Sequence, residues 1–196
     1  MTMPPYRLVP FIGLFLLMIC AAPDTARADR PAAFMKQAGL QLMAAARSRS
    51  HSMMTAVIQR YSDLPGIGLF SLGSYHTHLP RNRRSAYYES VARFMARYFI
   101  DQAGKFQVAK FQVVKQSTKT KWGFKVDSQV TLTNGEIHRL RWDVVPRSGS
   151  YKVRDVSIVG VWITPISMVS QQKNLFVDYI RDNDGKISAL LWALEN

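Results

Sequence analysis

The sequence predicts an α+β fold in which helices come first, an antiparallel sheet follows, and helices close the chain. Three observations lead to this prediction. Apolar residues recur at helical spacing over residues 31–102, alternate with a period of two over residues 106–163, and return to helical spacing over residues 166–195. Turn-forming residues separate the alternating segments, so we expect a meander of about four strands joined by short hairpins.

The first 28 residues have the pattern of a secretory signal peptide. Arg7 precedes an apolar run that includes FIGLFLLMIC, and Ala26-Arg27-Ala28 matches the small-residue cleavage pattern. The run is short for a transmembrane helix, although a retained anchor is the alternative. Cleavage after Ala28 would leave residues 29–196 as one domain and remove Cys20, the only cysteine. The mature chain would then contain no disulfide and no cysteine-ligated metal.

The charge is strongly positive, with 26 Lys and Arg against 13 Asp and Glu and a formal net charge of +13. Such a protein commonly binds nucleic acid or an anionic lipid surface. An export signal argues against nucleic acid, because an exported protein meets little of it, so we expect no nucleic-acid partner. A solvated basic surface without a specific partner is the alternative.

Four helices are predicted before the sheet. They span residues 31–46, residues 53–61, a short segment that Asp63 caps and that has Pro65 near its start, and residues 80–102. The last is the strongest, because Tyr87, Val91, Phe94 and Tyr98 form a stripe at helical spacing. Its arginines lie outside this stripe, so the apolar face is expected to cover the sheet.

The strands are predicted over residues 106–117, 121–133, 137–146 and 151–163. Asn134-Gly135 is a strong hairpin signal between the second and third strands, and residues 147–150 form the next turn. Alternation on the third strand places one set of side chains on a common face, namely His138, Leu140, Trp142 and Val144.

The fourth strand, YKVRDVSIVGVWI, carries apolar residues on both faces. Alternation places Val153 and Asp155 on one face and Val156 and Ile158 on the other. Gly160 indicates a bulge or a close backbone approach. Two apolar faces require extensive covering, which either an ordinary packed core or a sheet wrapped around an apolar pocket would supply. The helices after residue 166 would provide part of it, through Phe176 and Ile180.

Catalytic and metal-binding motifs are sparse. His76 and His78 would share a face on a strand, but no third ligand lies near them in the sequence. Residues 182–187 resemble part of a calcium loop, but both end positions of that loop carry apolar residues. Phosphate-binding loops and nucleophile elbows are absent from the sequence. An enzyme would have to rely on an aspartate in the sheet region, that is on one of Asp127, Asp143 and Asp155.

The order of motifs resembles the MlaC (toluene-tolerance) family of periplasmic phospholipid-shuttle proteins. The fourth strand carries most of the resemblance, through Tyr151, Lys152, Val153, Asp155, Val156, Gly160 and Val161. Leu72-Gly73 before the long aromatic helix adds to it. Trp162 stands where the family usually has a small polar residue and Tyr151 where it usually has Trp. Hopanoid-associated relatives share this pattern.

The resemblance implies an NTF2-like curved sheet wrapped by helices, with acyl chains held between helix and sheet. It implies a monomeric, non-enzymatic periplasmic carrier that needs no cofactor. Such a carrier would move phospholipid, or a hopanoid-like lipid, between an outer-membrane lipoprotein complex and an inner-membrane ABC transporter complex, with transient contact to membrane surfaces. The expected lipid-binding residues are Phe94, Tyr98, Val113, Val126, Leu140, Trp142, Val153, Ile158, Val161, Phe176 and Ile180.

Two other hypotheses remain at this point. An enzyme with an NTF2-like cavity would need one of the three aspartates as a buried base. A protein-binding subunit of an envelope complex would have a filled core and no cavity.

Overall fold

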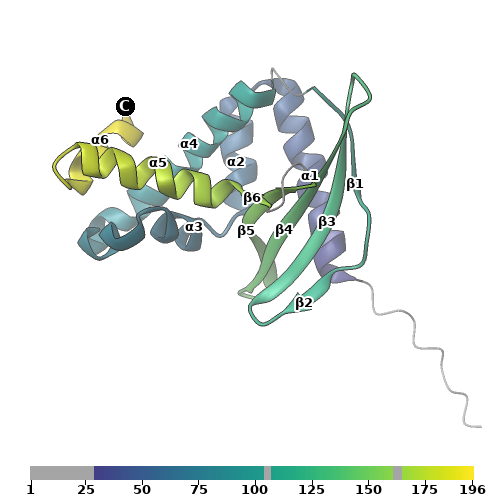
Figure 1. The fold of residues 1–196 in the computed structure, drawn as a ribbon, viewed down its shortest axis with the longest axis horizontal. Helices are drawn as coiled ribbons and strands as arrows, with labels where there is room; N and C mark the ends of the chain where they lie inside the picture. The colour runs from purple at the N-terminus through teal and green to yellow at the C-terminus, as the bar shows by residue number, and fades with distance from the viewer. Residues whose placement is uncertain (1–28, 104–106, 161–164) are drawn as a thin grey trace, which may run out of the picture.

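A computed structural model of the chain describes residues 29–103, 107–160 and 165–196. It confirms the predicted α+β fold, with helices before and after an antiparallel sheet (Figure 1). The helical elements are α1 (Arg30–Ser48), α2 (His51–Tyr61), α3 (Leu64–Ser71), η1 (Gly73–His78), η2 (Arg81–Arg83), α4 (Arg84–Ala103), α5 (Met168–Asp182) and α6 (Ile187–Glu195). The predicted helix over residues 80–102 thus begins with the short 3₁₀ turn η2. His76 and His78 lie in the 3₁₀ helix η1 and not on a strand.

The sheet contains the four predicted strands and two short ones at its edges. Its strands are β1 (Val108–Val113), β2 (Thr118–Thr120), β3 (Gly123–Leu132), β4 (Ile137–Arg147), β5 (Ser150–Val159) and β6 (Ile166–Ser167). The order is β1-β3-β4-β5-β6, with β2 also paired to β3, and every pairing is antiparallel. The meander follows from the two predicted turns.

Both hairpins depend on residues that tolerate left-handed backbone angles. Asn134 Oδ1 accepts a hydrogen bond from the Glu136 amide at 3.1 Å, and Gly135 has a φ of +90°. Ser148 and Gly149 connect β4 to β5 with φ values of +44° and +76°. Two successive positive φ values are typical of the turn whose twist matches antiparallel strands.

A bulge in β5 corrects the predicted alternation. Val153 pairs with Val144 and Asp155 pairs with Asp143, so Arg154 has no residue opposite it on β4. One extra residue shifts every later side chain to the other face. Val153 and Val156 therefore share the face of Val144 and Trp142, although the sequence placed them on opposite faces.

Gly160 does not carry this bulge. It follows the end of β5 with a φ of +88°, and a Cβ atom added there would meet nothing within 4 Å. Its positive φ therefore explains the glycine better than a close backbone approach does.

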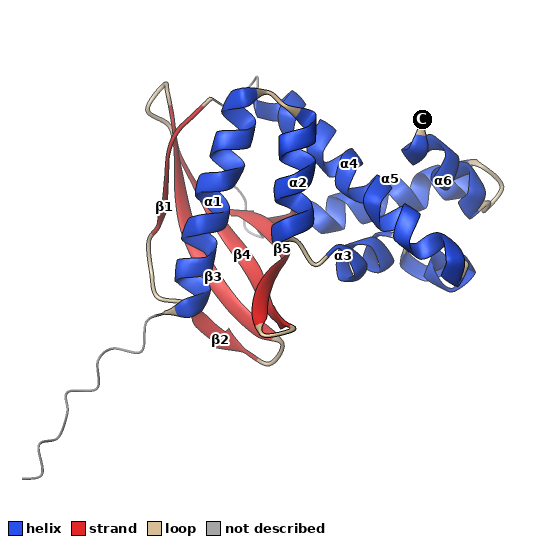
Figure 2. Cartoon of the chain, turned by 180° about the vertical axis from the view of Figure 1, so that it is seen from behind, coloured by secondary structure: helices blue, strands red, loops and turns tan. Residues whose placement is uncertain are grey.

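Two hydrophobic cores share helix α4. The first lies between α1, α2, α4 and the inner face of the sheet, and includes Met35, Ile58, Val126 and Trp142. The second lies among α3, α4, α5 and α6, and includes Tyr87 and Phe176. Figure 2 shows α1 and α2 in front of the sheet, with the α3–α5–α6 group to one side. No helix in the described ranges is long and apolar enough to cross a membrane.

Candidate functional site

A cavity of about 330 Å³ lies where the two cores meet. Helices α1, α2, α4 and α5 and strands β4 and β5 all contribute side chains to its wall, most of them apolar. Its lining residues are Ala38, Leu42, Val57, Ile58, Tyr61, Ser62, Ile67, Phe94, Met95, Tyr98, Phe99, Trp142, Val153, Asp155, Val156, Met168, Val169, Gln171, Gln172 and Leu175. Pockets of this size and character typically bind small apolar ligands.

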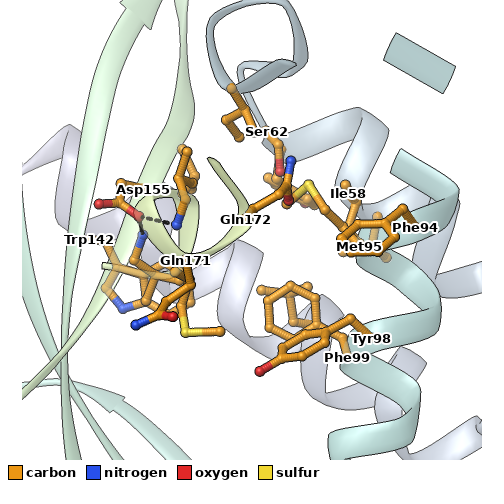
Figure 3. A pocket seen from close by; sticks show the side chains of 18 of the residues that line it. Ile58, Ser62, Phe94, Met95, Tyr98, Phe99, Trp142, Asp155, Gln171 and Gln172 are labelled. Atoms are coloured by element: carbon orange, nitrogen blue, oxygen red, sulfur yellow. Dashed lines mark hydrogen bonds between the residues drawn. The ribbon is translucent and has the colours of Figure 1, made fainter. Parts of the chain in front are cut away.

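Helix α4 supplies the aromatic wall. Phe94 lies one turn before the adjacent residues Tyr98 and Phe99, and all three face Trp142 and Asp155 across the cavity (Figure 3). Phe94 also packs edge-on against Phe176, with ring centroids 5.1 Å apart, so the second core holds it in place. Tyr98 is 42% exposed. The α4 wall therefore runs from a packed interior residue to one that reaches solvent.

The sheet supplies the opposite wall. The Trp142 indole Nε1–H donates to Ser128 Oγ at 2.8 Å, and both residues are buried. Because this bond satisfies the one polar atom of the indole, the ring can present an apolar surface to the cavity. The β5 bulge adds Val153 and Val156 to the same wall. The sheet wall of the cavity is therefore apolar because Arg154 is inserted in β5 and brings Val153 and Val156 to the same face.

Polar groups at the cavity are largely engaged within the protein. Asp155 Oδ1 accepts hydrogen bonds from the amides of Val156 at 2.8 Å and Val169 at 3.1 Å (Figure 3). The second bond ties β5 to the first turn of α5, where an acceptor is favoured. Gln172 Nε2 donates to Ser71 Oγ at 2.9 Å. Asp155 is the only charged residue among the described lining residues.

The three aspartates that an enzyme would need are all in structural contacts. Asp127 accepts two hydrogen bonds from Arg141, at 2.7 and 3.1 Å, and these lower the pKa of its carboxyl group. Asp143 pairs with Lys125. Asp155 accepts a hydrogen bond from the Val169 amide in the first turn of α5. Among the described residues no group of three His, Cys, Asp or Glu side chains is placed to bind a metal ion.

Four of the predicted lipid-binding residues line the cavity together, namely Phe94, Tyr98, Trp142 and Val153. The others lie elsewhere. Val126 is fully buried in the first core, with Val113 and Leu140 packed partly buried against it. Phe176 and Ile180 are buried in the second core, and Ile158 is half-buried opposite Leu140. Val161, like Trp162, lies outside the described residues. The lipid contact of each residue stays a prediction.

Several lining residues were not predicted. Met95 follows Phe94 on the aromatic helix and could have been included on that ground. Ala38, Val57 and Tyr61 belong to the first two helices, whose apolar faces carried no sign of a pocket. Gln172 was unforeseen, because a glutamine on an amphipathic helix is usually solvent-exposed.

Comparison with known proteins agrees with this architecture. The family model described as MlaC protein matches residues 32–196. A solved structure of a phospholipid-binding protein from Ralstonia solanacearum, in complex with a phospholipid, superimposes with a TM-score of 0.64 at 18% identity. The match covers 84% of this chain and 94% of the Ralstonia chain. No curated protein matched the sequence.

Proposed function

The chain belongs to the MlaC family, and we propose from this premise that it is an exported carrier that binds the acyl part of a phospholipid in the apolar cavity. The observation that carries the proposal is the cavity itself, which opens between two cores and has aromatic and aliphatic walls. The phospholipid complex of the Ralstonia relative supports the ligand class.

The size of the cavity sets how much of a lipid it can hold. A methylene group occupies about the volume of one water molecule, about 30 Å³, so a 330 Å³ cavity corresponds to about 11 methylenes. At roughly 0.8 kcal/mol per buried methylene, this gives about 9 kcal/mol before the cost of association. One acyl segment thus fits, and two full chains require the cavity to widen.

The headgroup is expected to remain near solvent. None of the described lining residues is a lysine or arginine, and Asp155 would repel a phosphate. Affinity would therefore come from burial of the acyl chain, which suits a carrier that must accept and release its ligand.

The remaining parts of the proposal concern the cellular setting. The N-terminal sequence supports export to the periplasm after cleavage at Ala28, and residues 29–196 would act as one monomeric lipid-binding domain. The carrier would exchange lipid with an outer-membrane lipoprotein complex and an inner-membrane ABC transporter complex. Its positive charge would favour association with acidic partner surfaces. The engagement of the three aspartates in structural contacts disfavours an enzymatic role.

The test is to purify the protein from cells that express the full chain and to analyse it by native mass spectrometry and lipid extraction. We expect a lipid adduct and recovery of phospholipid in the extract. A fraction stripped of lipid should take up phospholipid from vesicles. A lipid-free preparation that also fails to take up phospholipid would refute the proposal. Edman sequencing of the same protein should begin at Asp29.

A further inference from the structure

The turn between β2 and β3 exposes a tryptophan at one end of the sheet. Trp122 is 66% exposed, and Lys121 Nζ lies 4.7 Å from the centroid of its ring. Lys119, three residues before it on β2, is also exposed. Figure 1 shows β2 at the end of the sheet where α1 begins. A large aromatic ring in water, with one lysine over it and a second exposed lysine three residues earlier, has no evident role in packing this fold.

The acidic groups nearby are already engaged. Asp29 accepts hydrogen bonds from Ser117 and from the amide of Ala32. Asp143 pairs with Lys125, on the strand that leaves the turn. The donors to Asp29 are neutral, so its carboxylate keeps its charge, and Lys119 and Lys121 exceed it by one positive charge.

Basic residues continue across this end of the molecule. Arg30 and Arg147 line a second, shallow depression beside the Ser148-Gly149 turn. Arg147 also pairs with Asp63, at 2.7 Å. The β4–β5 turn lies at the same end of the sheet because β3 and β4 pair from Phe124–Val144 onward. Asp63 offsets the charge of Arg147, and the charged residues named at this end, five basic and three acidic, leave it with a net positive charge.

Tryptophan beside lysine is the combination that anionic membrane surfaces favour. The indole is amphipathic and settles at the headgroup level, and lysines nearby gain from the negative surface potential. Trp192 and the cavity lining, the two other apolar sites that could contact a membrane, lack this combination. Trp192 is 67% exposed, but no lysine or arginine lies within three residues of it and Glu195 follows. The cavity lining contains Asp155 and no described cation.

We propose that the β2–β3 turn, through Trp122, Lys119 and Lys121, docks the protein reversibly on the surface of an anionic lipid bilayer. The shortness of the turn limits it to shallow insertion at the headgroup level. Trp122 does not line the cavity, so the docking surface is separate from the ligand site. The inference does not depend on what the cavity binds.

The test is co-sedimentation with vesicles of phosphatidylcholine alone and of phosphatidylcholine mixed with phosphatidylglycerol. It uses the protein as processed by cells that express the full chain. We expect binding only to the mixed vesicles, and loss of binding as salt rises well above ~0.1 M, where the screening length is about 10 Å. Absence of binding to the mixed vesicles at low salt would overturn the proposal.

Three variants locate the surface. Trp122→Ala is expected to weaken partitioning by about tenfold. Lys119→Gln with Lys121→Gln is expected to weaken it by about 25-fold, because each lysine contributes about a factor of five. Trp192→Ala is the matched control and is expected to bind as wild type. Equal binding by all three, or an equal loss for Trp192→Ala, would overturn the proposal.

Two further measurements separate docking from folding and from cargo. All three side chains changed in the docking variants are exposed, so their melting temperatures should match that of wild type. Extracted lipid should also be unchanged in Trp122→Ala, because that residue lies outside the cavity. If the variants bind vesicles as wild type but lose binding to a purified envelope protein, the surface is a protein interface and the membrane assignment is wrong.

Discussion

Replacing Ala38 with leucine should separate cavity filling from core overpacking. Ala38 and Ala45 lie two turns apart on one face of α1, and both are 0% exposed in the first core. Ala38 lines the cavity, whereas Ala45 does not. The two substitutions add the same three carbons to the same helix, one beside empty space and one within packed core.

The expected changes in lipid affinity and in stability follow from the volume that the leucine side chain adds. Three carbons at about 30 Å³ each would fill about 90 Å³, more than a quarter of the 330 Å³ cavity. Displacing about three methylenes of ligand at 0.8 kcal/mol each costs about 2.4 kcal/mol, or about a fiftyfold loss of lipid affinity. The ligand-free Ala38→Leu protein should be at least as stable as wild type. Ala45→Leu should lose about 1–3 kcal/mol through overpacking.

The assay has two parts. Urea unfolding of delipidated protein gives the free energy of unfolding, and competition against a fluorescent fatty acid gives the relative lipid affinity. Lipid binding by Ala38→Leu as tight as that of wild type would refute this prediction. Destabilisation of the ligand-free protein by Ala38→Leu to the same extent as by Ala45→Leu would refute it as well.

Three further predictions concern stability. Gly39→Ala should cost about 1–3 kcal/mol in urea unfolding, because its Cβ would come within 2.2 Å of the Phe111 ring. Tyr87→Phe should cost about 1 kcal/mol, because the buried hydroxyl donates to a carbonyl of α3 at 2.9 Å; an unchanged unfolding midpoint would contradict this. Arg141 lowers the pKa of Asp127, so the pair stabilises the fold above the ordinary aspartate pKa and loses this contribution as pH falls through the lowered pKa. Asp127→Asn should therefore be about 0.5 kcal/mol less stable than wild type at neutral pH, with a difference that disappears in acid; a difference that persists in acid would contradict the assignment.

Most of the fold could be predicted from local signals. The helices followed from apolar periodicity, and the hairpin at Asn134-Gly135 followed from turn chemistry. The β5 bulge was not predicted, although Arg154 and Asp155 are two consecutive charged residues between Val153 and Val156 and so interrupt the alternation at the inserted residue. The short strands β2 and β6 depend on pairing with β3 and β5, which local sequence does not specify.

The cavity was predictable only in part, because its lining depends on how far apart the helices and strands lie. Aromatic residues on α4 and β4 identified one pair of walls, through Phe94 and Trp142. Whether a buried apolar residue lines a cavity or a packed core depends on the distance between elements, which composition does not encode. Phe176 and Ile180 illustrate this, because α5 turns their face toward α6 and the second core.

The central claim is that a lipid acyl chain lies in the cavity between α4 and the sheet. Site-specific photocrosslinking tests it directly, with benzoylphenylalanine in place of Tyr98 and, as a control, in place of Tyr179. Both tyrosines are helical and similarly exposed, at 42% and 37%, but only Tyr98 lines the cavity. After irradiation in cells, intact mass spectrometry should show a lipid-sized increment on the Tyr98 variant and none on the Tyr179 variant. No adduct at Tyr98, or equal adducts at both positions, would contradict the account.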